Sequence, residues 1–318
     1  MSKDIYRALC ADQKDIPVFS RDWWLDVVCG DGWDVLLFER KGAILAAMPL
    51  YIPCKRIISM PHYTQTMGVW FAGESDDTKY TSRLEQRRSI CRYFIEKLLP
   101  YRSFLQNFNY GFTDWLPFYW EDYSQSTRYT YILHDIKDFD RIENGMNQQT
   151  RRNIKAAKNA KIHVERGIST EQLLKIQEQT FQRQQLTNKQ SDAVLRRLIA
   201  AACQRGQGEV FGGYGENGNL HAAVFIVWQD SSAHYIAGGG DPAFRQSGAH
   251  SLVMREAIQY VSQFTDKFDF DGSMLPGVEH FFRGFGAEQT PYFTISRGKP
   301  TFLDRICIKL KFRSLADR

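Results

Sequence analysis

The alternation of hydrophobic and polar positions predicts a β-hairpin in each half of the chain. Residues 33–38 and 44–49 are the first pair of predicted strands, because both are rich in hydrophobic residues and a short polar turn with a glycine separates them. Residues 209–225 repeat this arrangement around Asn217-Gly218, a dipeptide that favours the type I′ turn of hairpins. We therefore expect an antiparallel strand pair in each half.

Comparison of the two halves indicates an internal duplication. A shift of 175 positions places Val35 on Val210 in the hairpins. Both halves then follow the same order of predicted elements, from a strand through an amphipathic helix, a strand and a short aromatic helix to a last strand. In this part a shift of 163 positions aligns four residues: Phe118 with Phe281, Thr127 with Thr290, Tyr129 with Tyr292 and Ile132 with Ile295. The sequence therefore predicts two similar α/β units.

A polar segment at residues 135–150 separates the halves and leads into a predicted basic helix. Arg151, Lys155 and Lys158 recur at helical spacing and share one face, with Arg152 beside them. This face is either the solvated side of a linker helix or a surface that binds substrate phosphates.

Two further amphipathic helices are predicted at residues 169–181 and 192–203. Their leucine and isoleucine stripes indicate packing against a core. We assign no chemistry to them.

A glycine-rich loop follows the second hairpin. The strand at residues 232–240 ends in three glycines and contains Tyr235, a candidate substrate contact, and the loop after it enters a helix predicted at residues 251–264. Backbone N–H groups at a helix N-terminus suit a pyrophosphate or a developing oxyanion, although many ordinary strand-to-helix turns also use glycine. The candidate cofactor-binding residues are Gly240, Arg245, Gly248, Ala249 and His250.

Carboxylates occupy alternate positions of the next predicted strand. In Phe268-Asp269-Phe270-Asp271 the aspartates share one face, because strand side chains alternate between faces. A short helix at residues 279–285 follows, with Glu279 and Arg283. Asp271 and Glu279 are candidate bases, and Asp269 and Arg283 are candidate substrate contacts. The structural alternative is that Asp271 caps the loop and Arg283 pairs with a carboxylate.

The duplication assigns different roles to the two halves. The 163-residue shift places the ionisable residues of the second half on residues that do not ionise: Asp269 on Gln106, Asp271 on Phe108 and Arg283 on Trp120. We therefore expect the chemistry in the second half and substrate recognition in the first.

Composition narrows the class of protein. The 318 residues are 43% hydrophobic and 24% charged, which suits a large core and two domains, and the net charge of +5 is too small to indicate nucleic acid by itself. The six cysteines show no C-x-x-C pair and the seven histidines no metal-ligand spacing, so we expect reduced thiols and no metal. The lack of a long apolar segment or a signal sequence predicts a cytoplasmic protein.

Three motifs of the second half occur together. They are R-x-N-I-x-x-A at residues 151–157, D-F-D-G at residues 269–272 and E-x-x-F-x-x-F-G at residues 279–286. Together they resemble the Fem-type (FemABX) transferases of the GNAT acyltransferase superfamily, over about residues 140–300. The segment from Pro61 is similar to the family's first-domain loop with its T-Q-x-x-G pattern, which makes Gln65 and Trp70 candidate substrate contacts.

The resemblance implies an α/β (α+β) protein of two tandem GNAT-like domains, each a mixed, mostly antiparallel sheet flanked by helices, with a cleft between them. It also implies an N-acyltransferase that moves an acyl or aminoacyl group to an amine of a cell-wall, glycan or nucleotide-linked precursor. The superfamily's acetyl-CoA loop has the form Q/R-x-x-G-x-G/A, whereas residues 245–250 end in histidine. The donor is therefore either an acyl-CoA, such as acetyl-CoA, or an aminoacyl-tRNA.

We expect domains at residues 1–135 and 136–300 and a basic tail at residues 301–318. In the reaction, Lys299 would stabilise charge in the transition state beside the candidate bases. Two alternatives remain. One is a non-catalytic protein that uses the basic helix and tail to bind RNA or an anionic surface at the inner face of the membrane, and the other is a decayed transferase scaffold.

Overall fold

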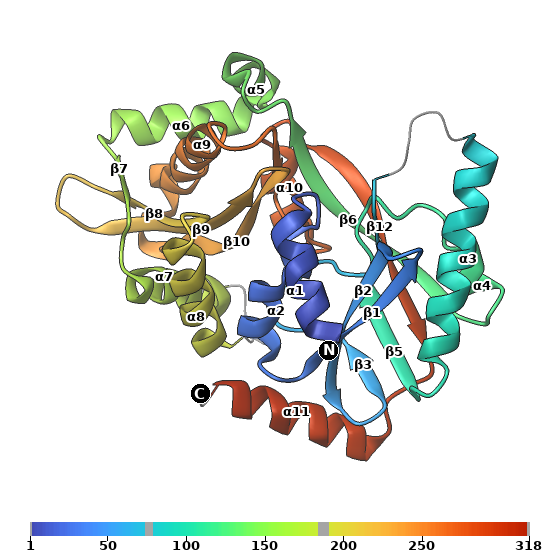
Figure 1. Ribbon diagram of the computed structural model, residues 1–318. Helices are drawn as coiled ribbons and strands as arrows, with labels where there is room; N and C mark the ends of the chain where they lie inside the picture. Colours follow the sequence, from blue (N-terminus) through green and yellow to red (C-terminus); the bar gives the residue numbers. More distant parts are fainter. Residues whose placement is uncertain (1, 74–78, 184–190, 317–318) are drawn as a thin grey trace. The chain divides into compact units, whose positions relative to one another are not determined.

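The computed structural model describes residues 2–73, 79–183 and 191–316 and divides the chain into two compact units (Figure 1). Unit 1 comprises Met1–Arg128 and Pro291–Arg318, and unit 2 comprises Tyr129–Thr290. The sequence predicted a boundary after residue 135 and a separate tail. The structure differs because the last strand and the C-terminal helix pack on the sheet of unit 1.

Unit 1 is a mixed sheet with helices on both faces. Its elements are α1 (Ser2–Asp12), η1 (Val18–Ser20), α2 (Asp22–Cys29), β1 (Trp33–Arg40), β2 (Ala43–Cys54), β3 (Ile57–Ser59), β4 (Trp70–Phe71), α3 (Tyr80–Leu98), β5 (Ser103–Asn107), α4 (Leu116–Tyr119), the start of β6 (Ser124–His134), most of β12 (Glu288–Arg297) and α11 (Phe302–Ala316). The strand order is β1-β2-β3-β5-β12, and β4 also pairs with β2. Only the β3–β5 pair is parallel among the registers of these strands.

The two faces of β2 hold different helices. Met48 and Leu50 belong to the same buried cluster as Phe94 of α3. Tyr51 points to the opposite face, because strand side chains alternate, and its ring centroid lies 6.0 Å from that of Phe312 in α11. The predicted hairpin, β1 with β2, is confirmed as an antiparallel pair.

The predicted tail is the helix α11, docked on β2. A disulfide joins Cys54 at the end of β2 to Cys307 of α11. The expectation that all cysteines are reduced is therefore wrong for this pair, because the fold brings together two residues that no local spacing connects. No helix in the described part of the chain combines the length and hydropathy of a bilayer span.

Unit 2 is built in the same way. Its elements are the end of β6, α5 (Phe139–Gly145), α6 (Gln148–Asn159), β7 (His163–Arg166), α7 (Thr170–Arg183), α8 (Asp192–Gln204), β8 (Gly208–Tyr214), β9 (Leu220–Gln229), β10 (Ser232–Gly240), the 3-10 helix η2 (Pro242–Ser247), α9 (Ala249–Val261), β11 (Lys267–Asp269), α10 (Pro276–Arg283) and the start of β12. The strand order is β6-β11-β10-β9-β8-β7. Among the strand pairs described for this unit, only β10 and β11 are parallel.

Glycines of β8 show which helix covers each face of this sheet. A Cβ on Gly213 would meet Val253 of α9 at 2.6 Å, and a Cβ on Gly208 would meet Ala202 of α8 at 2.5 Å. Odd and even positions of a strand point to opposite faces. The helix α9, with α6 against it, therefore covers one face, and α8 with α7 covers the other.

The strand registers confirm the predicted repeat. Gln106 of β5 pairs with Ile295 of β12, and Asp269 of β11 pairs with Ile132 of β6. The same 163-residue shift relates Gln106 to Asp269 and Ile132 to Ile295. The last strand of each half therefore pairs within the unit built mainly by the other half, which explains the displaced domain boundary.

Candidate active site

A cavity of about 450 Å³ opens at the end of β10 in unit 2. The ends of α7 and α9 and the helix α10 form its walls. All five residues predicted to bind a cofactor line it: Gly240, Arg245, Gly248, Ala249 and His250. Tyr235, predicted as a substrate contact, lines it as well.

The cavity arises because β10 and β11 diverge. The two strands pair only at Ala233–Phe268 and His234–Asp269. β11 ends there, whereas β10 continues to Gly240 with β9 as its only strand neighbour among the described residues. Backbone N–H and C=O groups on the other edge of β10 are therefore placed to bind a ligand.

Gly248 sets the approach of α9 to α6. Its φ is +72°, and a Cβ there would lie 2.0 Å from the carbonyl oxygen of Asn153. Only glycine fits this position without strain and without displacing α6. Gly248 offers no side-chain cap, and the Ser247 hydroxyl accepts from the N–H of Ala249 at 3.2 Å. The positive end of the α9 dipole lies at the cavity beside the exposed Arg245. This end of the cavity suits an anion.

Stacked rings form two walls of the cavity. The ring of His250 stacks on Phe281 at 4.5 Å, and that of His221 stacks on Phe244 at 3.8 Å. Burial lowers the pKa of His221, which favours the neutral imidazole. The Nδ1 atom of His221 is buried and has no hydrogen-bond partner in the described part of the chain. This atom can therefore serve a polar group of a ligand.

A buried cluster lies where β10 and β11 are paired, next to the point at which they diverge. Asp271 follows β11, and its Oδ1 atom lies 3.0 Å from Nδ1 of His234. The Nε2 atom of His234 lies 2.7 Å from the Ser232 hydroxyl. Asp269 accepts hydrogen bonds on Oδ1 from the backbone N–H of Asp271, at 2.8 Å, and from the hydroxyl of Thr130. None of these five residues lines the cavity.

The two aspartates come together by a turn and not along one strand face. The strand ends at Asp269, and Asp271 has a φ of +57°, so the predicted alternation stops before Asp271. A left-handed conformation is tolerated best by glycine, asparagine and aspartate. The turn places the Asp271 carboxylate against the imidazole of His234.

Burial dominates the electrostatics of this cluster. It raises the pKa of Asp271 well above its usual value and, with a smaller contribution from Asp271, raises the pKa of Asp269 to about 7. Burial also lowers the pKa of His234. One atom from each of these three residues lies within 4.8 Å of the others, the spacing of a possible metal site. Both ring nitrogens of His234 also form hydrogen bonds, one with Asp271 and one with Ser232.

Glu279 and Arg283 form a separate pair on α10. The Nε group of Arg283 donates to Glu279 Oε1 at 2.8 Å, and the hydroxyl of Tyr131 donates to the same oxygen at 2.9 Å. The hydrogen bond from Arg283 lowers the pKa of Glu279. The sequence left open that Arg283 pairs with a carboxylate instead of binding substrate, and the structure contains this pair. Neither Glu279 nor Arg283 lines the cavity.

The predicted phosphate contacts of α6 lie outside the cavity lining. Arg151 and Arg152 are both exposed, and Nη1 of Arg151 donates to the carbonyl of Asn144 at 3.2 Å. The helix buries Ile154 and Ala157 on its opposite side.

Three predicted residues belong to unit 1. The carbonyl of Gln65 accepts from Nδ2 of Asn107 at 2.9 Å, and the indole N–H of the buried Trp70 donates to Asp15 at 3.1 Å. Lys299 is exposed between β12 and α11.

Sequence reasoning missed several residues of unit 2, among them His221 of the cavity lining. Ser232 and His234 carry no motif, and their role depends on a partner 37 positions away. No chemistry was assigned to α7, yet Thr180 and Phe181 line the cavity. One signal was present: a Cβ on Gly239 would lie 2.1 Å from Thr180 Oγ1, and glycine inside a strand indicates a close approach.

Comparisons with known proteins agree with this geometry. Residues 145–283 match the family described as an acetyltransferase (GNAT) domain. The structure is similar to that of FemX, with 12% identity, a TM-score of 0.66 and coverage of 92% of this chain and 96% of that chain. It is also similar to L-PGS from Bacillus licheniformis, with 10% identity, a TM-score of 0.56 and coverage of 99% and 97%.

A third similar structure is a tandem GNAT protein from the clavulanic acid biosynthesis pathway, with 10% identity, a TM-score of 0.51 and coverage of 92% of each chain. At identities of 10% to 12%, the similarity of these structures shows a shared fold and does not extend to activity. The predicted fold, two tandem GNAT-like units as in Fem-like proteins, is thereby confirmed. A comparison with curated protein sequences finds no significant match.

Proposed function

Because residues 145–283 form a GNAT acetyltransferase domain, we propose that this protein moves an acyl group from a CoA thioester to a primary amine, with the donor bound in the cavity of unit 2. One observation carries the proposal. The cavity opens where β10 loses β11 as its neighbour, and the N-terminal turn of α9, with Gly248 as its N-cap, lies at the same place. An extended chain with a pyrophosphate at one end matches such a site.

The lining residues have distinct roles in this proposal. Arg245 and the N-terminal turn of α9 bind the donor phosphates, and His221 Nδ1 bonds to a polar group of the donor. Backbone groups on the open edge of β10 near Tyr235 orient the acyl carbonyl and stabilise the charge that develops on its oxygen. Burial raises the pKa of Tyr235, so its phenol keeps its proton and serves as a hydrogen-bond donor.

The acceptor amine must lose a proton when its nitrogen bonds to the acyl carbon and the carbon–sulfur bond breaks. We assign the proton to Asp271, directly or through water, and not to Glu279. Burial makes the deprotonated carboxylate of Asp271 a stronger base, whereas the ion pair with Arg283 makes Glu279 a weaker base. Lys299 would stabilise charge in the transition state. Asp269 positions Asp271 by accepting a hydrogen bond from the backbone N–H of Asp271.

For the acceptor we propose an amine of a cell-wall, glycan or nucleotide-linked precursor. The exposed cations Arg151 and Arg152, and Arg283 at 60% side-chain exposure, are the candidate contacts for its phosphates. Gln65 and Trp70 of unit 1 stay candidate substrate contacts, and the proposed reaction takes place in the cytoplasm, either in solution or at the inner face of the membrane.

A second donor class is an aminoacyl-tRNA. The exposed basic face of α6, with Arg151, Arg152, Lys155 and Lys158, favours it, because such a face attracts a nucleic acid backbone. The same face would serve a non-catalytic RNA-binding protein. Binding of RNA without transfer of an acyl group to any amine would support that alternative.

The test supplies the purified protein with acetyl-CoA, longer acyl-CoAs and charged tRNA, each with a panel of amines. Free thiol is measured for the CoA donors, and mass spectrometry identifies the acylated amine. We expect turnover with an acyl-CoA, a loss of about tenfold or more in kcat/KM for Arg245→Ala, and little change for the control Gln246→Ala. Gln246 is the exposed neighbour of Arg245 and does not line the cavity. Turnover with charged tRNA alone, or with no donor, would contradict the proposal.

A further inference from the structure

The helix α11 forms an outer edge of unit 1 and exposes an apolar face (Figure 1). Four large apolar side chains of this helix are between 41% and 76% exposed: Phe302, Leu303, Ile306 and Leu310. Phe302, Ile306 and Leu310 follow one another at four-residue spacing, and Leu303 precedes Ile306 by three positions, so all four share one side of the helix. We call this set the α11 apolar face. A contiguous group of exposed apolar side chains marks a contact surface, whereas scattered ones are ordinary.

The opposite side of α11 holds the helix on the sheet of unit 1. Asp304 is buried and forms an ion pair with Arg102. The ring of Phe312 packs against Tyr51 of β2, with centroids 6.0 Å apart, and Leu315 is buried as well. Asp304 and Leu315 are eleven positions apart, close to three helical turns, so these contacts lie on one side. The α11 apolar face is therefore not the side through which the helix packs on the sheet.

Basic side chains flank the α11 apolar face. Arg305 and Lys309 are exposed, and their four-residue spacing places them next to each other along one edge of this face. Lys55 is exposed in the turn after β2, beside the disulfide that joins β2 to α11. Asp304, the single acidic residue of α11, is buried on the other side. The exposed surface of the helix therefore combines apolar and positively charged groups.

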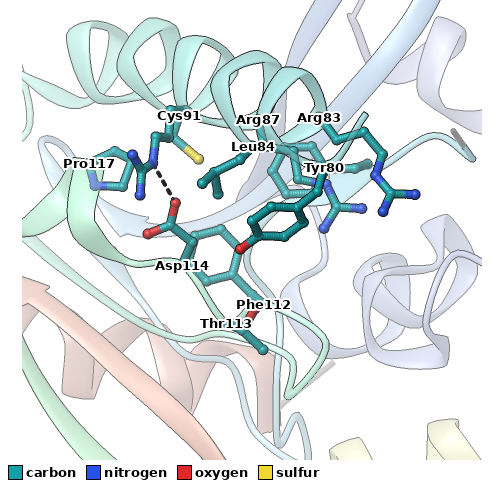
Figure 2. A pocket seen from close by; sticks show the side chains of 11 residues that line it. Tyr80, Arg83, Leu84, Arg87, Cys91, Phe112, Thr113, Asp114 and Pro117 are labelled. Carbon is teal, nitrogen blue, oxygen red and sulfur yellow. Dashed lines mark hydrogen bonds and ion pairs between the residues drawn. The ribbon is translucent and has the colours of Figure 1, made fainter. Parts of the chain in front are cut away.

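These cations differ from the arginines of α3, which are engaged within the chain. In the cavity between α3 and residues 112–117, Nε of Arg88 donates to Asp114 at 2.7 Å (Figure 2). By contrast, the side chains of Arg305, Lys309 and Lys55 form no ion pair with any residue that the structure describes. Their charge is therefore available to an external anion.

This combination fits the surface of a membrane that contains anionic phospholipids. Apolar side chains of a helix that lies in the interface enter the outer part of the acyl layer, while lysine and arginine stay at the headgroup phosphates. A second copy of the chain fits less well, because it would bring the same cations to the contact. RNA fits less well too, because its phosphates pair with the cations but offer the aliphatic side chains of the α11 apolar face no apolar partner.

We propose that the α11 apolar face docks on an anionic phospholipid membrane, with its four side chains inserted at the interface and with Arg305 and Lys309 bound to headgroup phosphates. The helix lies along the membrane surface and stays attached to the sheet of unit 1 through its other side. Both kinds of contact contribute, so the loss of either weakens binding. The proposal does not rest on acyl transfer in unit 2.

Cosedimentation of the full chain with lipid vesicles, in the absence of any acyl donor, tests the proposal. We expect binding to vesicles of phosphatidylglycerol and phosphatidylcholine in equal parts, and binding about tenfold weaker or less to phosphatidylcholine alone. Arg305→Ala/Lys309→Ala should weaken binding to the mixed vesicles about tenfold or more. Phe302→Ala/Leu310→Ala should weaken it by a similar factor, because two inserted side chains are lost. All four residues are exposed, so the fold should persist.

The matched controls remove the same kinds of group elsewhere in unit 1. Leu116→Ala/Tyr119→Ala truncates two exposed apolar residues of α4, and Arg40→Ala/Lys97→Ala removes two exposed cations. Both should bind the mixed vesicles as the wild type does. If circular dichroism shows that Phe302→Ala/Leu310→Ala does not fold, Phe302→Gln/Leu310→Gln replaces it.

Several results would overturn the proposal. They are no binding of the wild type to mixed vesicles, equal binding to phosphatidylcholine alone, unchanged binding by either α11 double variant, or equal losses in the controls. Binding of RNA without binding of vesicles would assign the surface to a nucleic acid instead. Self-association without vesicle binding, if Phe302→Ala/Leu310→Ala abolishes it in light scattering, would assign the surface to a second copy of the chain.

Discussion

His234 and Asp271 face each other across a 3.0 Å hydrogen bond between Nδ1 and Oδ1, with side-chain exposures of 6% and 16%. Burial raises the pKa of the Asp271 carboxyl and lowers the pKa of the His234 imidazole, so it favours the neutral form of each group. Once deprotonated, the Asp271 carboxylate is therefore a stronger base than a solvent-exposed carboxylate. This property supports Asp271 as the proton acceptor of unit 2.

Asp271→Asn should lower kcat by about 10²-fold and change KM for the donor little, because the amide cannot take up the proton. Asparagine tolerates the left-handed conformation at this position, so the fold should persist. Steady-state kinetics with the acyl-CoA donor measures the effect. The control is Asp266→Asn, an exposed carboxylate nearby that pairs with Lys137. Turnover of Asp271→Asn within about threefold of wild type would remove the assignment.

Asp269 should make the protein less stable as the pH rises from about 4 to about 7. Its pKa is about 7 in the folded chain, against an ordinary value of 3.8, because burial disfavours the carboxylate. Within this window the folded chain keeps a proton that the unfolded chain has lost, so the stabilisation is complete below the window and lost above it.

Urea unfolding at several pH values measures this trend in wild type and in Asp269→Asn. The amide oxygen can still accept from Thr130 and from the backbone N–H of Asp271. We expect the variant to lack this part of the pH dependence. Equal slopes of the free energy of unfolding against pH in both proteins would show that Asp269 does not titrate in this range.

Gly248→Ala and Gly218→Ala form a matched pair. Both glycines have a φ near +70°, at +72° and +74°, but a Cβ on Gly248 would lie 2.0 Å from a carbonyl of α6, whereas a Cβ on Gly218 would meet nothing within 4 Å. We expect Gly218→Ala to cost about 1–2 kcal/mol from backbone strain. Gly248→Ala should cost about 1–3 kcal/mol more, because it also overfills the space beside α6. Thermal unfolding compares the two, and equal losses would argue against the close approach at Gly248.

The pair of Cys54 and Cys307 should protect two of the six thiols. Alkylation of the unfolded, unreduced protein should modify the four others: Cys10, Cys29, Cys91 and Cys203. Reduction should then lower the free energy of unfolding of unit 1 by about 2–4 kcal/mol. The control Cys203→Ser replaces an exposed free cysteine and should leave stability unchanged. Six alkylated thiols before reduction would contradict the pairing.

Much of the fold follows from the sequence, because local patterns and a repeat determine it. The hairpins, the glycine-terminated strand and the matched positions of the two halves all rely on neighbouring residues or on a constant shift. In the structure the last strand of each half pairs with a strand of the other half: Asp269 pairs with Ile132, and Gln106 with Ile295. This exchange could not be predicted, because a repeated sequence offers an equivalent partner strand in each half. The disulfide is a long-range contact of the same kind.

The candidate site was predictable where one segment builds it. The loop from Gly240 to His250 lines the cavity as a contiguous stretch. The partner of Asp271 was not predictable, because His234 comes from another strand and its spacing matches no motif. Thr180 was not predicted for a similar reason, because its helix α7 shows only the hydrophobic stripe of a helix that packs against a core. Residues that act through a fold-dependent neighbour leave little trace in the sequence.

Hydrogen–deuterium exchange of the full chain with and without saturating acetyl-CoA tests the central claim most directly, because it reports where the donor binds. We expect slower exchange at residues 238–252, which span the end of β10, η2 and the start of α9, and at residues 275–282 of α10. Slower exchange confined to unit 1, or no change in unit 2 under conditions that saturate the protein, would contradict the placement of the donor in this cavity.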